Sequence, residues 1–427
     1  MAVSFDNLAK AYRDRGVGGF GGGIERQPVT LLPEPTRRER YFTVISVDDH
    51  LVEPPHTFEG RMPSKFKDRA PTVVDTEDGG QAWLYDGKLL PNIGLNAVVG
   101  RPVNDKSFEP MRFDEMRRGT WDINARIHDM NLDGVYASLG FPSFLAGFGG
   151  GRIQTVTKDL ELALAAVRAW NQFHIEEWAG TYPDRIIPCQ IPWLHDPELG
   201  AEEIRRNAAL GFRAVTFPEA LSNFGFPSIH TRHWDPIMAA CEETETVVCV
   251  HVGSAGSIPA TDPDAPPDVS NILFGGYAMM TTVDWLYSLY PVRFPKIKIA
   301  MSEGGIGWVA GLMDRLIHCE RNTEKFGTWW GLDISAHDAL QRNFWFCAVD
   351  DPTAYKVRDR IGVDKICYEV DYPHGDSSWP NTQELLRAQL AGVSPEDVAR
   401  ITWQNASELF RHPVPKAIQN DPNAFGT

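Results

Sequence analysis

The sequence lacks the features that mark several broad classes of protein. Its 427 residues contain no apolar run near the ~18 residues that a membrane-spanning helix needs. The first residues contain no apolar core of the secretory type. Basic residues are fewer than acidic ones, 41 against 57, and the formal charge of −16 does not support binding to nucleic acid or to an anionic membrane surface. We therefore expect a cytoplasmic protein whose partner is a small-molecule substrate.

Cysteine is also scarce, and no two cysteines form a C-x-x-C pair. Most of the six lie inside apolar segments, where a reduced thiol behaves as a small packing residue. They are Cys189, Cys241, Cys249, Cys319, Cys347 and Cys367. This pattern indicates reduced thiols in a cytosolic protein.

Short β-branched runs alternate with amphipathic stretches from residue 41 to residue 411. This alternation is typical of strand–helix units around a parallel sheet. Eight runs predict an α/β fold with a closed (β/α)8 TIM barrel, although an open doubly wound sheet would show the same pattern. The predicted strands are 43–47, 134–140, 185–191, 214–217, 246–250, 296–301, 344–349 and 365–370. The predicted helices include 160–180, 197–210, 235–245, 307–325 and 395–410.

Three segments do not follow this alternation. Residues 56–125, after the first strand, read as short strands joined by glycine turns, and we expect a small β insertion that covers the barrel mouth as a lid. Residues 412–427 are expected to form a C-terminal tail. Residues 1–40 are expected to form an N-terminal arm, because the glycine-rich run 17–23 has neither the preceding strand nor the following helix of a dinucleotide-binding loop.

The N-terminal arm carries apolar side chains that a free tail would leave in water. They are Phe5, Leu8, Tyr12 and Phe20. We predict that the arm packs across its own barrel or a neighbouring one. The expected assembly is a homodimer, the commonest symmetric oligomer.

Metal-compatible side chains follow three of the predicted strands. Asp48, Asp49 and His50 end the first strand, His251 follows the fifth, and Asp371 follows the eighth. Active-site groups of such barrels lie at the carboxyl ends of the strands. Because alternate residues face the same side, Asp48 and His50 can point inward together while Asp49 points away. A single histidine at a strand end is more often structural, but four such groups on three strands favour a site for one divalent ion, Zn²⁺ first and Mn²⁺ next.

Two further residues are candidates for proton transfer beside that ion. Glu303 follows Met301 by two residues, so alternation predicts that both face the barrel interior. Glu303 could be a proton carrier, a ligand or a structural acid at a glycine turn, and we favour the proton carrier. His374 is the second candidate, unless Asp376 merely holds it in a loop. Glu53 is the reserve ligand, since it follows the first strand closely.

A series of short motifs runs through the chain in one order. They are SVDDHLVEP (46–54), DMNLDGV (129–135), Asn171 with YPDR (182–185), GFRAV (211–215), HVGS (251–254), SEGG (302–305), DYPH (371–374) and Asn405-Ala406. With these motifs, residues 43–411 resemble the second amidohydrolase family, which includes the aminocarboxymuconate-semialdehyde decarboxylase-like enzymes. The resemblance implies a metal-dependent (β/α)8 barrel.

The resemblance also implies roles for particular residues. The family's ligand positions fall on Asp48, His50, His251 and Asp371, and Asp371 is counted among the catalytic residues as well. Two positions depart from the common pattern. The first-strand pair is Asp-x-His where His-x-His is frequent, and Glu303 stands where a catalytic histidine is frequent. The second departure argues against copying the mechanism of the histidine-bearing decarboxylases.

Three functions are compatible with these residues. The first is hydrolysis, in which metal-activated water attacks an amide, ester or lactone carbonyl of a small organic substrate. The alternative is metal-dependent, non-oxidative decarboxylation of an aromatic or unsaturated carboxylic acid. The third is a metal-stabilised binding protein without turnover, which the two proton-transfer candidates disfavour. Release of CO₂ would separate the second function from the first.

Overall fold

A closed parallel barrel forms the centre of the molecule. The computed structural model describes residues 2–4, 29–77, 79–91, 93–102, 111–259, 262, 264–323 and 327–426. The strand order of the main sheet is β7-β6-β2-β14-β13-β12-β10-β9-β8. The strands are β2 (Ile45–Leu51), β6 (Ala137–Pro142), β7 (Ile186–Ile187), β8 (Cys189–Gln190), β9 (Ala214–Phe217), β10 (Val247–His251), β12 (Ile299–Ser302), β13 (Phe344–Ala348) and β14 (Ile366–Tyr368).

The two ends of this order, β7 and β8, are consecutive pieces of one strand. Pro188 separates them, and proline has no N–H to donate to a neighbouring strand. β7 pairs with β6 on one side, whereas β8 pairs with β9 on the other. The Pro188 carbonyl accepts hydrogen bonds from the backbone N–H groups of Arg213 (3.0 Å) and Ala214 (3.2 Å). The sheet therefore closes, and the predicted barrel of eight strands is confirmed.

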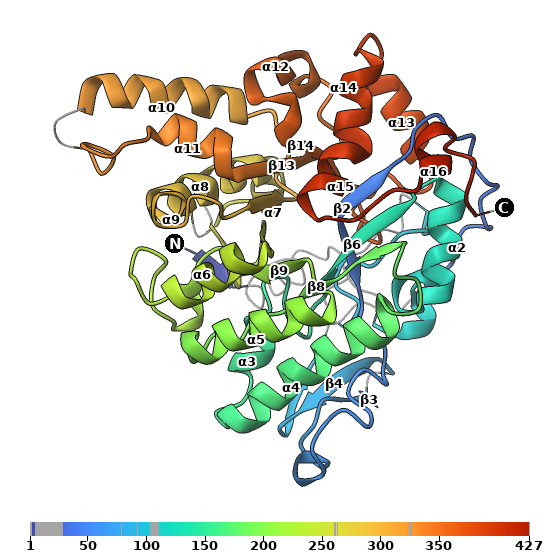
Figure 1. Cartoon of the computed structure of the whole chain (residues 1–427). Coiled ribbons are helices and arrows are strands. Elements are labelled where there is room, and N and C mark those ends of the chain that lie inside the picture. Colours follow the sequence, from blue (N-terminus) through green and yellow to red (C-terminus); the bar gives the residue numbers. More distant parts are fainter. Residues whose placement is uncertain are drawn as a thin grey trace.

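Helices surround the barrel and connect its strands (Figure 1). Helix α5 shows how the sequence sets their ends, because Asp196 accepts hydrogen bonds from two backbone N–H groups of the first turn and Gly211 ends the helix with φ 114°. The helices are α2 (Ile123–Asp133), α3 (Arg152–Thr155), α4 (Leu160–Phe173), α5 (Pro197–Leu210), α6 (Asp235–Thr244), α7 (Pro267–Ile272), α8 (Phe274–Tyr287), α9 (Tyr290–Arg293), α10 (Val309–Thr323), α11 (Ala336–Asn343), α12 (Arg358–Ile361), α13 (Thr382–Gln389), α14 (Pro395–Ala399), α15 (Asn405–Leu409) and α16 (Lys416–Asn420).

Several elements differ from their predicted bounds by a few residues, and three of these differences have a clear structural cause. Strand β2 continues four residues beyond the predicted end, because β6 pairs with it through Asp49 and His50 after a register shift. The predicted helix 160–180 is α4 followed by a π-helical turn, His174–Trp178. The predicted helix 395–410 is likewise interrupted by a π-helical turn, Arg400–Gln404, between α14 and α15. Periodicity in the sequence does not distinguish these wider turns from an α-helix.

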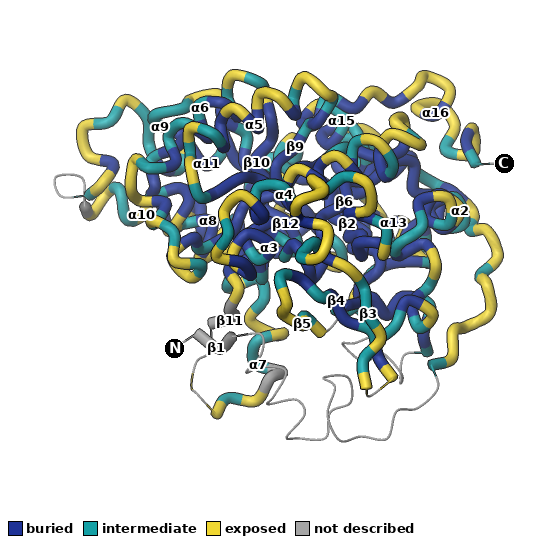
Figure 2. The backbone as a smooth tube through the Cα atoms, turned by 90° about the horizontal axis from the view of Figure 1, so that it is seen from below, coloured by how far each residue is buried: buried dark blue, intermediate teal, exposed yellow. Residues whose placement is uncertain are grey.

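Two apolar clusters hold the fold together. One packs the outer faces of the strands against the helices and includes Trp170, Trp234 and Trp285. The other joins the inner faces of the strands to the C-terminal segment and includes Leu139 and Phe410. Figure 2 shows the buried strands at the centre and exposed segments around them. In the described part of the chain, no helix combines the length and the apolar character needed to cross a membrane.

The insertion after β2 carries a small antiparallel sheet, as predicted. Its order is β3-β4-β5, with β3 at Thr72–Asp75, β4 at Gln81–Tyr85 and β5 at Lys88–Leu90. Later residues of the insertion contact the segment after β14. The Val99 N–H donates to the Pro373 carbonyl (3.0 Å), and the Gly375 N–H donates to Oδ1 of Asn96 (3.2 Å). The insertion thus reaches the barrel end at which the candidate metal ligands lie.

The N-terminal segment is only partly described. Strand β1 (Ala2–Ser4) pairs antiparallel with β11 (Ser257–Pro259) of the same chain. The four apolar side chains on which the arm prediction rests lie outside the described residues, so its packing role and the homodimer stay predictions. Described residues later in this segment contact the insertion and helix α2. The Leu32 N–H, for example, donates to the Gly100 carbonyl (2.8 Å).

Arg40 links the start of the barrel to the C-terminal tail, and we predict that Arg40→Ala lowers stability. Its buried guanidinium donates to the carbonyls of Asn131 (2.6 Å) and Phe425 (2.7 Å) and lies 3.9 Å from the centroid of the Phe425 ring. The hydrogen bonds and the ring contact that this substitution removes together contribute roughly 2–3 kcal/mol to the free energy of unfolding. Urea unfolding, followed by tryptophan fluorescence, should show a loss of that size.

Arg37→Ala is the matched control for that measurement. Arg37 is exposed and makes a longer hydrogen bond, 3.3 Å, to the same Phe425 carbonyl. We expect a change below about 0.5 kcal/mol, as for most surface substitutions. Equal unfolding midpoints for the two variants would contradict the role of Arg40.

Candidate metal centre

Four predicted ligands lie together at one end of the barrel. Asp48 and His50 belong to β2, His251 is the last residue of β10, and Asp371 follows the end of β14 by three residues. All four side chains are buried. Parallel strands of a closed barrel bring their carboxyl ends to one rim, so residues far apart in sequence meet there.

The donor atoms of these residues are spaced as ligands of one ion. The Nε2 atoms of His50 and His251 are 2.9 Å apart, and Oδ1 of Asp48 lies 3.5 Å and 3.4 Å from them. Donor atoms around a tetrahedral zinc ion, at bond lengths of 2.0–2.1 Å, are about 3.3–3.4 Å apart. Oδ1 of Asp371 lies 3.6 Å from Nε2 of His50. Asp48, His50 and His251 thus form one group of possible ligands, and Asp371 joins through a second group that His50 and His374 share.

The protonation of the two imidazoles supports a cation between them. Nδ1 of His50 faces the Pro142 carbonyl at 3.4 Å, and Nδ1 of His251 faces the Val252 carbonyl at 2.6 Å. A carbonyl can only accept, so each Nδ1 carries a proton, and in a neutral imidazole Nε2 then keeps its lone pair. Two lone pairs that face each other at 2.9 Å repel unless a positive charge lies between them. Such an outer hydrogen bond on Nδ1 is typical of metal-ligating histidines.

Buried polar atoms without hydrogen bonds are a second indication that this cluster binds a cation. Among the described residues, both carboxyl oxygens of Asp48 and Asp371 and both ring nitrogens of His374 make no hydrogen bond. Burial raises the pKa of Asp48 and of Asp371 well above the usual range of a carboxyl group. Burial also lowers the pKa of His50 well below its usual value. A divalent cation would satisfy carboxyl oxygens of Asp48 and Asp371 that face it, so the residues fit the metal.

The carboxylates of Asp49 and Glu53 do not point toward the candidate ligands. Asp49 accepts hydrogen bonds from the Ser46 hydroxyl (2.9 Å) and the Tyr372 N–H (3.1 Å), on the side of the strand away from the cluster. Glu53, the reserve ligand of the sequence analysis, accepts from the Trp170 indole N–H at 3.2 Å. Neither carboxylate belongs to a group of possible metal ligands in the described residues. Burial raises the pKa of Glu53 to about 7.

The Glu303 side chain points to the cluster, but not because residues along its strand alternate between two faces. Ser302 is paired with His251 and faces the interior, whereas Met301 packs in the outer cluster, so the expectation that Met301 and Glu303 share a face was wrong. Strand β12 ends at Ser302, and Glu303 has a left-handed backbone with φ 59°. That turn places its Oε2 3.3 Å from Nε2 of His251. Asp371 also has a left-handed backbone, with φ 55°.

Glu303 therefore lies near enough to be either a ligand or a proton carrier. Its Oε1 is 3.9 Å from Nδ1 of His374, which in turn is 2.8 Å from Oδ1 of Asp371, although that pair is not aligned as a hydrogen bond. Burial raises the pKa of Glu303 well above its usual range, while His251 opposes the shift. Burial lowers the pKa of His374 to about 3, so this imidazole is neutral at pH 7.

Two residues of the site, Glu369 and Phe148, were not found from the sequence. Glu369 precedes Asp371 by two residues, and alternation along β14 could have found it. Its carboxylate accepts from the Glu303 N–H (3.1 Å) and from the Cys347 thiol, and burial raises its pKa to about 8. Phe148 lies in a loop without a periodic signal, and its ring centroid is 4.5 Å and 4.7 Å from those of His50 and His251.

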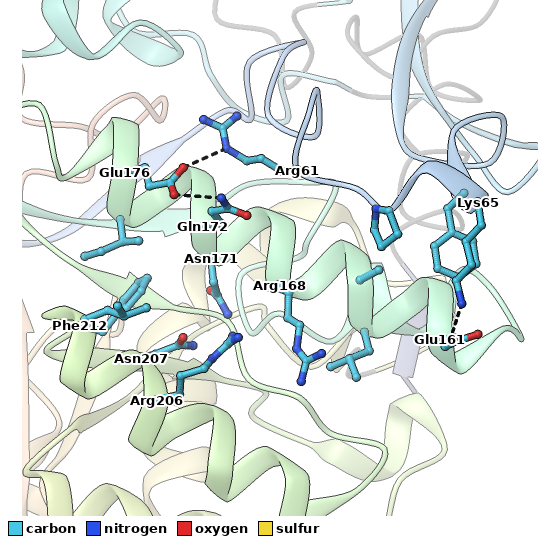
Figure 3. A pocket seen from close by; sticks show the side chains of 16 residues that line it. Arg61, Lys65, Glu161, Arg168, Asn171, Gln172, Glu176, Arg206, Asn207 and Phe212 are labelled. Atoms are coloured by element: carbon cyan, nitrogen blue, oxygen red, sulfur yellow. Dashed lines mark hydrogen bonds and ion pairs between the residues drawn. The ribbon is translucent and has the colours of Figure 1, made fainter.

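Two cavities differ in how they relate to this cluster. The larger, about 710 Å³, lies outside the barrel between α4 and α5 (Figure 3), and its charges are largely paired, as in Arg61–Glu176 and Lys65–Glu161. A smaller one, about 150 Å³, lies beside the candidate ligands. It is lined by Leu95, Ser143, Phe144, Gly147, Phe148, Arg152, Phe224, Gly253, Ser254 and Gly256. Because Phe148 touches both histidine rings, the smaller cavity is the candidate substrate site.

Solved structures share this architecture. An amidohydrolase from Mycobacterium avium subsp. paratuberculosis is 22% identical over 86% of this chain and 99% of its own, with a TM-score of 0.69. The 5-carboxyvanillate decarboxylase of Sphingomonas paucimobilis is 18% identical over 86% and 99%, with a TM-score of 0.61. That of Novosphingobium aromaticivorans, solved with manganese and 4-hydroxy-3-methoxy-5-nitrobenzoic acid, is 17% identical over 88% and 98%, with a TM-score of 0.60. At such identities the likeness shows the fold alone.

The comparison of sequences agrees with the fold. No curated protein sequence matches the chain significantly. The sequence profile of the amidohydrolases (Amidohydro_2) matches residues 82–412, which is more than half of the chain. That match begins after β2, so the placement of Asp48 and His50 rests on the structure. With this profile and a barrel that carries a buried His/Asp metal site, the chain belongs to the amidohydrolase family.

Proposed function

We propose that this chain is a metal-dependent decarboxylase of a small aromatic carboxylic acid. The observation that carries the proposal is the contact between the His/Asp cluster and an aromatic cavity, in which Phe148 lies against His50 and His251. Two structural neighbours are named as decarboxylases of an aromatic acid, and one holds manganese and a nitrobenzoic acid. Decarboxylation, the alternative of the sequence analysis, therefore has more support than hydrolysis.

The proposed ligands are Asp48, His50, His251 and Asp371. Two imidazole nitrogens with carboxylate oxygens suit Zn²⁺, and the manganese of the neighbour makes Mn²⁺ an equal candidate. A divalent metal held there would supply positive charge to the substrate's carboxylate and an adjacent oxygen. The aromatic wall would meanwhile exclude water from the ring, which strengthens every electrostatic interaction inside the cavity.

Glu303 is the proposed proton carrier. Its carboxyl group would donate a proton to the ring carbon that bears the carboxylate, and the new C–H bond would use a pair of ring π electrons. The bond to the carboxylate carbon would then break, its electrons would return to the ring, and CO₂ would leave. Glu303 would regain a proton from solvent. Oε2 of Glu303 is 3.3 Å from a proposed ligand atom, so a substrate at the ligands would lie within its reach.

Hydrolysis is the second candidate, because a neighbour is named as an amidohydrolase. Glu303 would then accept a proton from the attacking water. A panel of aromatic acids, amides and lactones separates the two functions. We expect the metal-loaded protein to release CO₂ from at least one aromatic acid, measured in a coupled CO₂ assay and by mass spectrometry of the product. A new acid from an amide or lactone, without CO₂ from any substrate, would contradict decarboxylation.

The substitution Glu303→Gln tests the proton carrier. It keeps the shape of the side chain but removes the acid, and general acid catalysis contributes ~10²–10⁴-fold. We expect kcat to fall by about that factor, while elemental analysis shows unchanged bound metal. Glu408→Gln is the matched control, because its side chain is 68% exposed, and it should retain full activity. Loss of metal from Glu303→Gln would instead make Glu303 a ligand, and full activity would leave His374 as the better candidate.

Variants of Asp48, His251 and Asp49 test the ligand assignment. Asp48→Asn removes the negative charge of one proposed ligand and His251→Ala removes another ligand altogether, so each purified protein should contain well below one metal ion per chain. Asp49→Asn changes the neighbouring acid, which points to Ser46 and Tyr372, and should keep the metal content of the unmodified chain. Elemental analysis of folded protein, checked by circular dichroism, decides. Equal metal loss in Asp48→Asn and Asp49→Asn would refute the assignment.

A further inference from the structure

The backbone at Glu303 has a conformation that a residue with a side chain disfavours. Its φ of 59° lies in the left-handed region, where the Cβ atom crowds the following carbonyl oxygen. Such a conformation persists only where the surrounding structure holds it. With an extended backbone the side chain would leave the strand in another direction. The groups that hold this turn therefore also set the 3.3 Å between Oε2 of Glu303 and Nε2 of His251.

A buried carboxylate holds the first residue of the turn. Glu369 directly follows β14 and is fully buried. Its Oε2 accepts hydrogen bonds from the Glu303 backbone N–H (3.1 Å) and from the Cys347 thiol. The Glu369 backbone N–H donates to the carbonyl of Ala348 (3.1 Å), the last residue of β13. Glu369 is thus held through both its backbone and its side chain, and it offers the Glu303 peptide an acceptor at a fixed place.

A second carboxylate and helix α8 hold the rest of the turn. Oδ2 of Asp351 accepts a hydrogen bond from the Ile306 N–H (3.0 Å). Gly305 has φ +61°, and a Cβ atom there would lie 2.7 Å from Oδ2 of Asp351. A Cβ atom on Gly304 would overlap Cβ of Ala278 in α8. The two glycines therefore allow the close packing that fixes the turn.

We propose that Glu369 is a positioning residue, which acts through the backbone of Glu303 to aim that side chain at the metal ligands, with Asp351 as a second support of the same turn. The inference rests on the proposed function, because it takes Glu303 as the proton carrier. In this role Glu369 transfers no proton and serves only as a hydrogen-bond acceptor. Another acceptor of the same shape should therefore replace it, whereas an apolar side chain of similar size should not.

Crystal structures of metal-loaded variants test the positioning without any measurement of activity. Glu369→Met removes the acceptor, and we expect Oε2 of Glu303 to lie about 1 Å or more beyond its present 3.3 Å from Nε2 of His251. Glu369→Gln is the matched control, because it also removes the acid but keeps a carbonyl oxygen that can accept from the Glu303 N–H. It should leave Glu303 in place.

Turnover tests the consequence for catalysis, with whichever substrate the panel identifies. A misplacement of about 1 Å can lower a rate about 10²-fold, so Glu369→Met should lower kcat about 10- to 100-fold. KM should change less than about threefold, because the lost interaction acts in the transition state. Glu369→Gln should restore kcat to within about threefold of the unmodified chain. In a Glu303→Gln background, Glu369→Met should lower kcat less than about threefold further, because no acid remains to be misplaced.

Variants of Asp351 form a second pair, which carries the test if Glu369→Met does not fold. Asp351→Asn keeps an oxygen for the Ile306 N–H, whereas Asp351→Ala does not. We expect Asp351→Ala, but not Asp351→Asn, to move Glu303 and to lower kcat. Circular dichroism and elemental analysis verify that each variant is folded and metal-loaded. Loss of metal from folded Glu369→Met would refute the inference, because Glu369 would then act on Asp48, with which its carboxylate forms a group of possible ligands.

The outcomes separate this inference from the proposed function. If Glu369→Met moves Glu303 but Glu303→Gln keeps full activity, Glu303 is not the proton carrier and the positioning role stands. If Glu303→Gln loses activity while Glu369→Met and Asp351→Ala both leave Glu303 in place, the positioning role is refuted and the proposed function stands. An equal loss of kcat on Glu369→Met with and without Glu303→Gln would also refute an action through Glu303.

Discussion

The repulsion between buried donor atoms is the constraint on which this structure depends. Two imidazole nitrogens with facing lone pairs lie 2.9 Å apart, and a carboxylate oxygen of Asp48 lies within 3.5 Å of both. In water these groups would separate. In the barrel they belong to different strands, and closure of the sheet fixes the distance between those strands. A divalent cation held there would convert the repulsion into attraction, and its charge would offset the cost of burying the acids.

A second layer of buried groups holds the ligands in this arrangement. The Arg126 guanidinium is fully buried, donates to the backbone carbonyl of His50, and lies 4.2 Å from the centroid of the Tyr372 ring. The Tyr372 hydroxyl donates to Asp129 (2.5 Å), which also accepts two hydrogen bonds from Arg117. Strand β2 and the segment after β14 are thereby tied together behind the site. Outer contacts of this kind orient metal ligands and maintain their affinity for the ion.

The sequence allows the barrel to be predicted because its signal is repeated. Eight short β-branched runs alternate with helices, and polar residues recur where those runs end, so the rim that carries Asp48, His50 and His251 follows from topology alone. The split of the third strand at Pro188 did not change that count. What could not be predicted depends on single backbone angles. The left-handed turn at Glu303 aims its side chain at His251, and simple alternation put it in the site for the wrong reason.

Loop residues were beyond prediction for a related cause. Phe148 lies in the loop between β6 and α3, and Arg152 is the first residue of the four-residue helix α3, which is too short to show a 3.6-residue period. Their positions come from tertiary contacts, such as Phe148 against the two histidines and Arg152 over Phe144. The motif DMNLDGV shows the reverse case. Its first acid, Asp129, contributes to the family resemblance in the sequence, and in the structure it accepts hydrogen bonds from Arg117 and Tyr372 and so belongs to the supporting layer.

The rim formed by the strand ends and the segment after β6 contribute differently to the recognition of a substrate. The rim offers fixed nitrogen and oxygen donors that suit a metal and hence an oxyanion, while the loop after β6 offers rings and one guanidinium. A chain with a formal charge of −16 would repel an anion over most of its surface, but a local field is set by the nearest charges. A divalent cation held by Asp48, His50, His251 and Asp371 would be the positive charge nearest to these side chains. The proposed binding of an aromatic carboxylate follows from the placement of these ligands and does not depend on the overall composition.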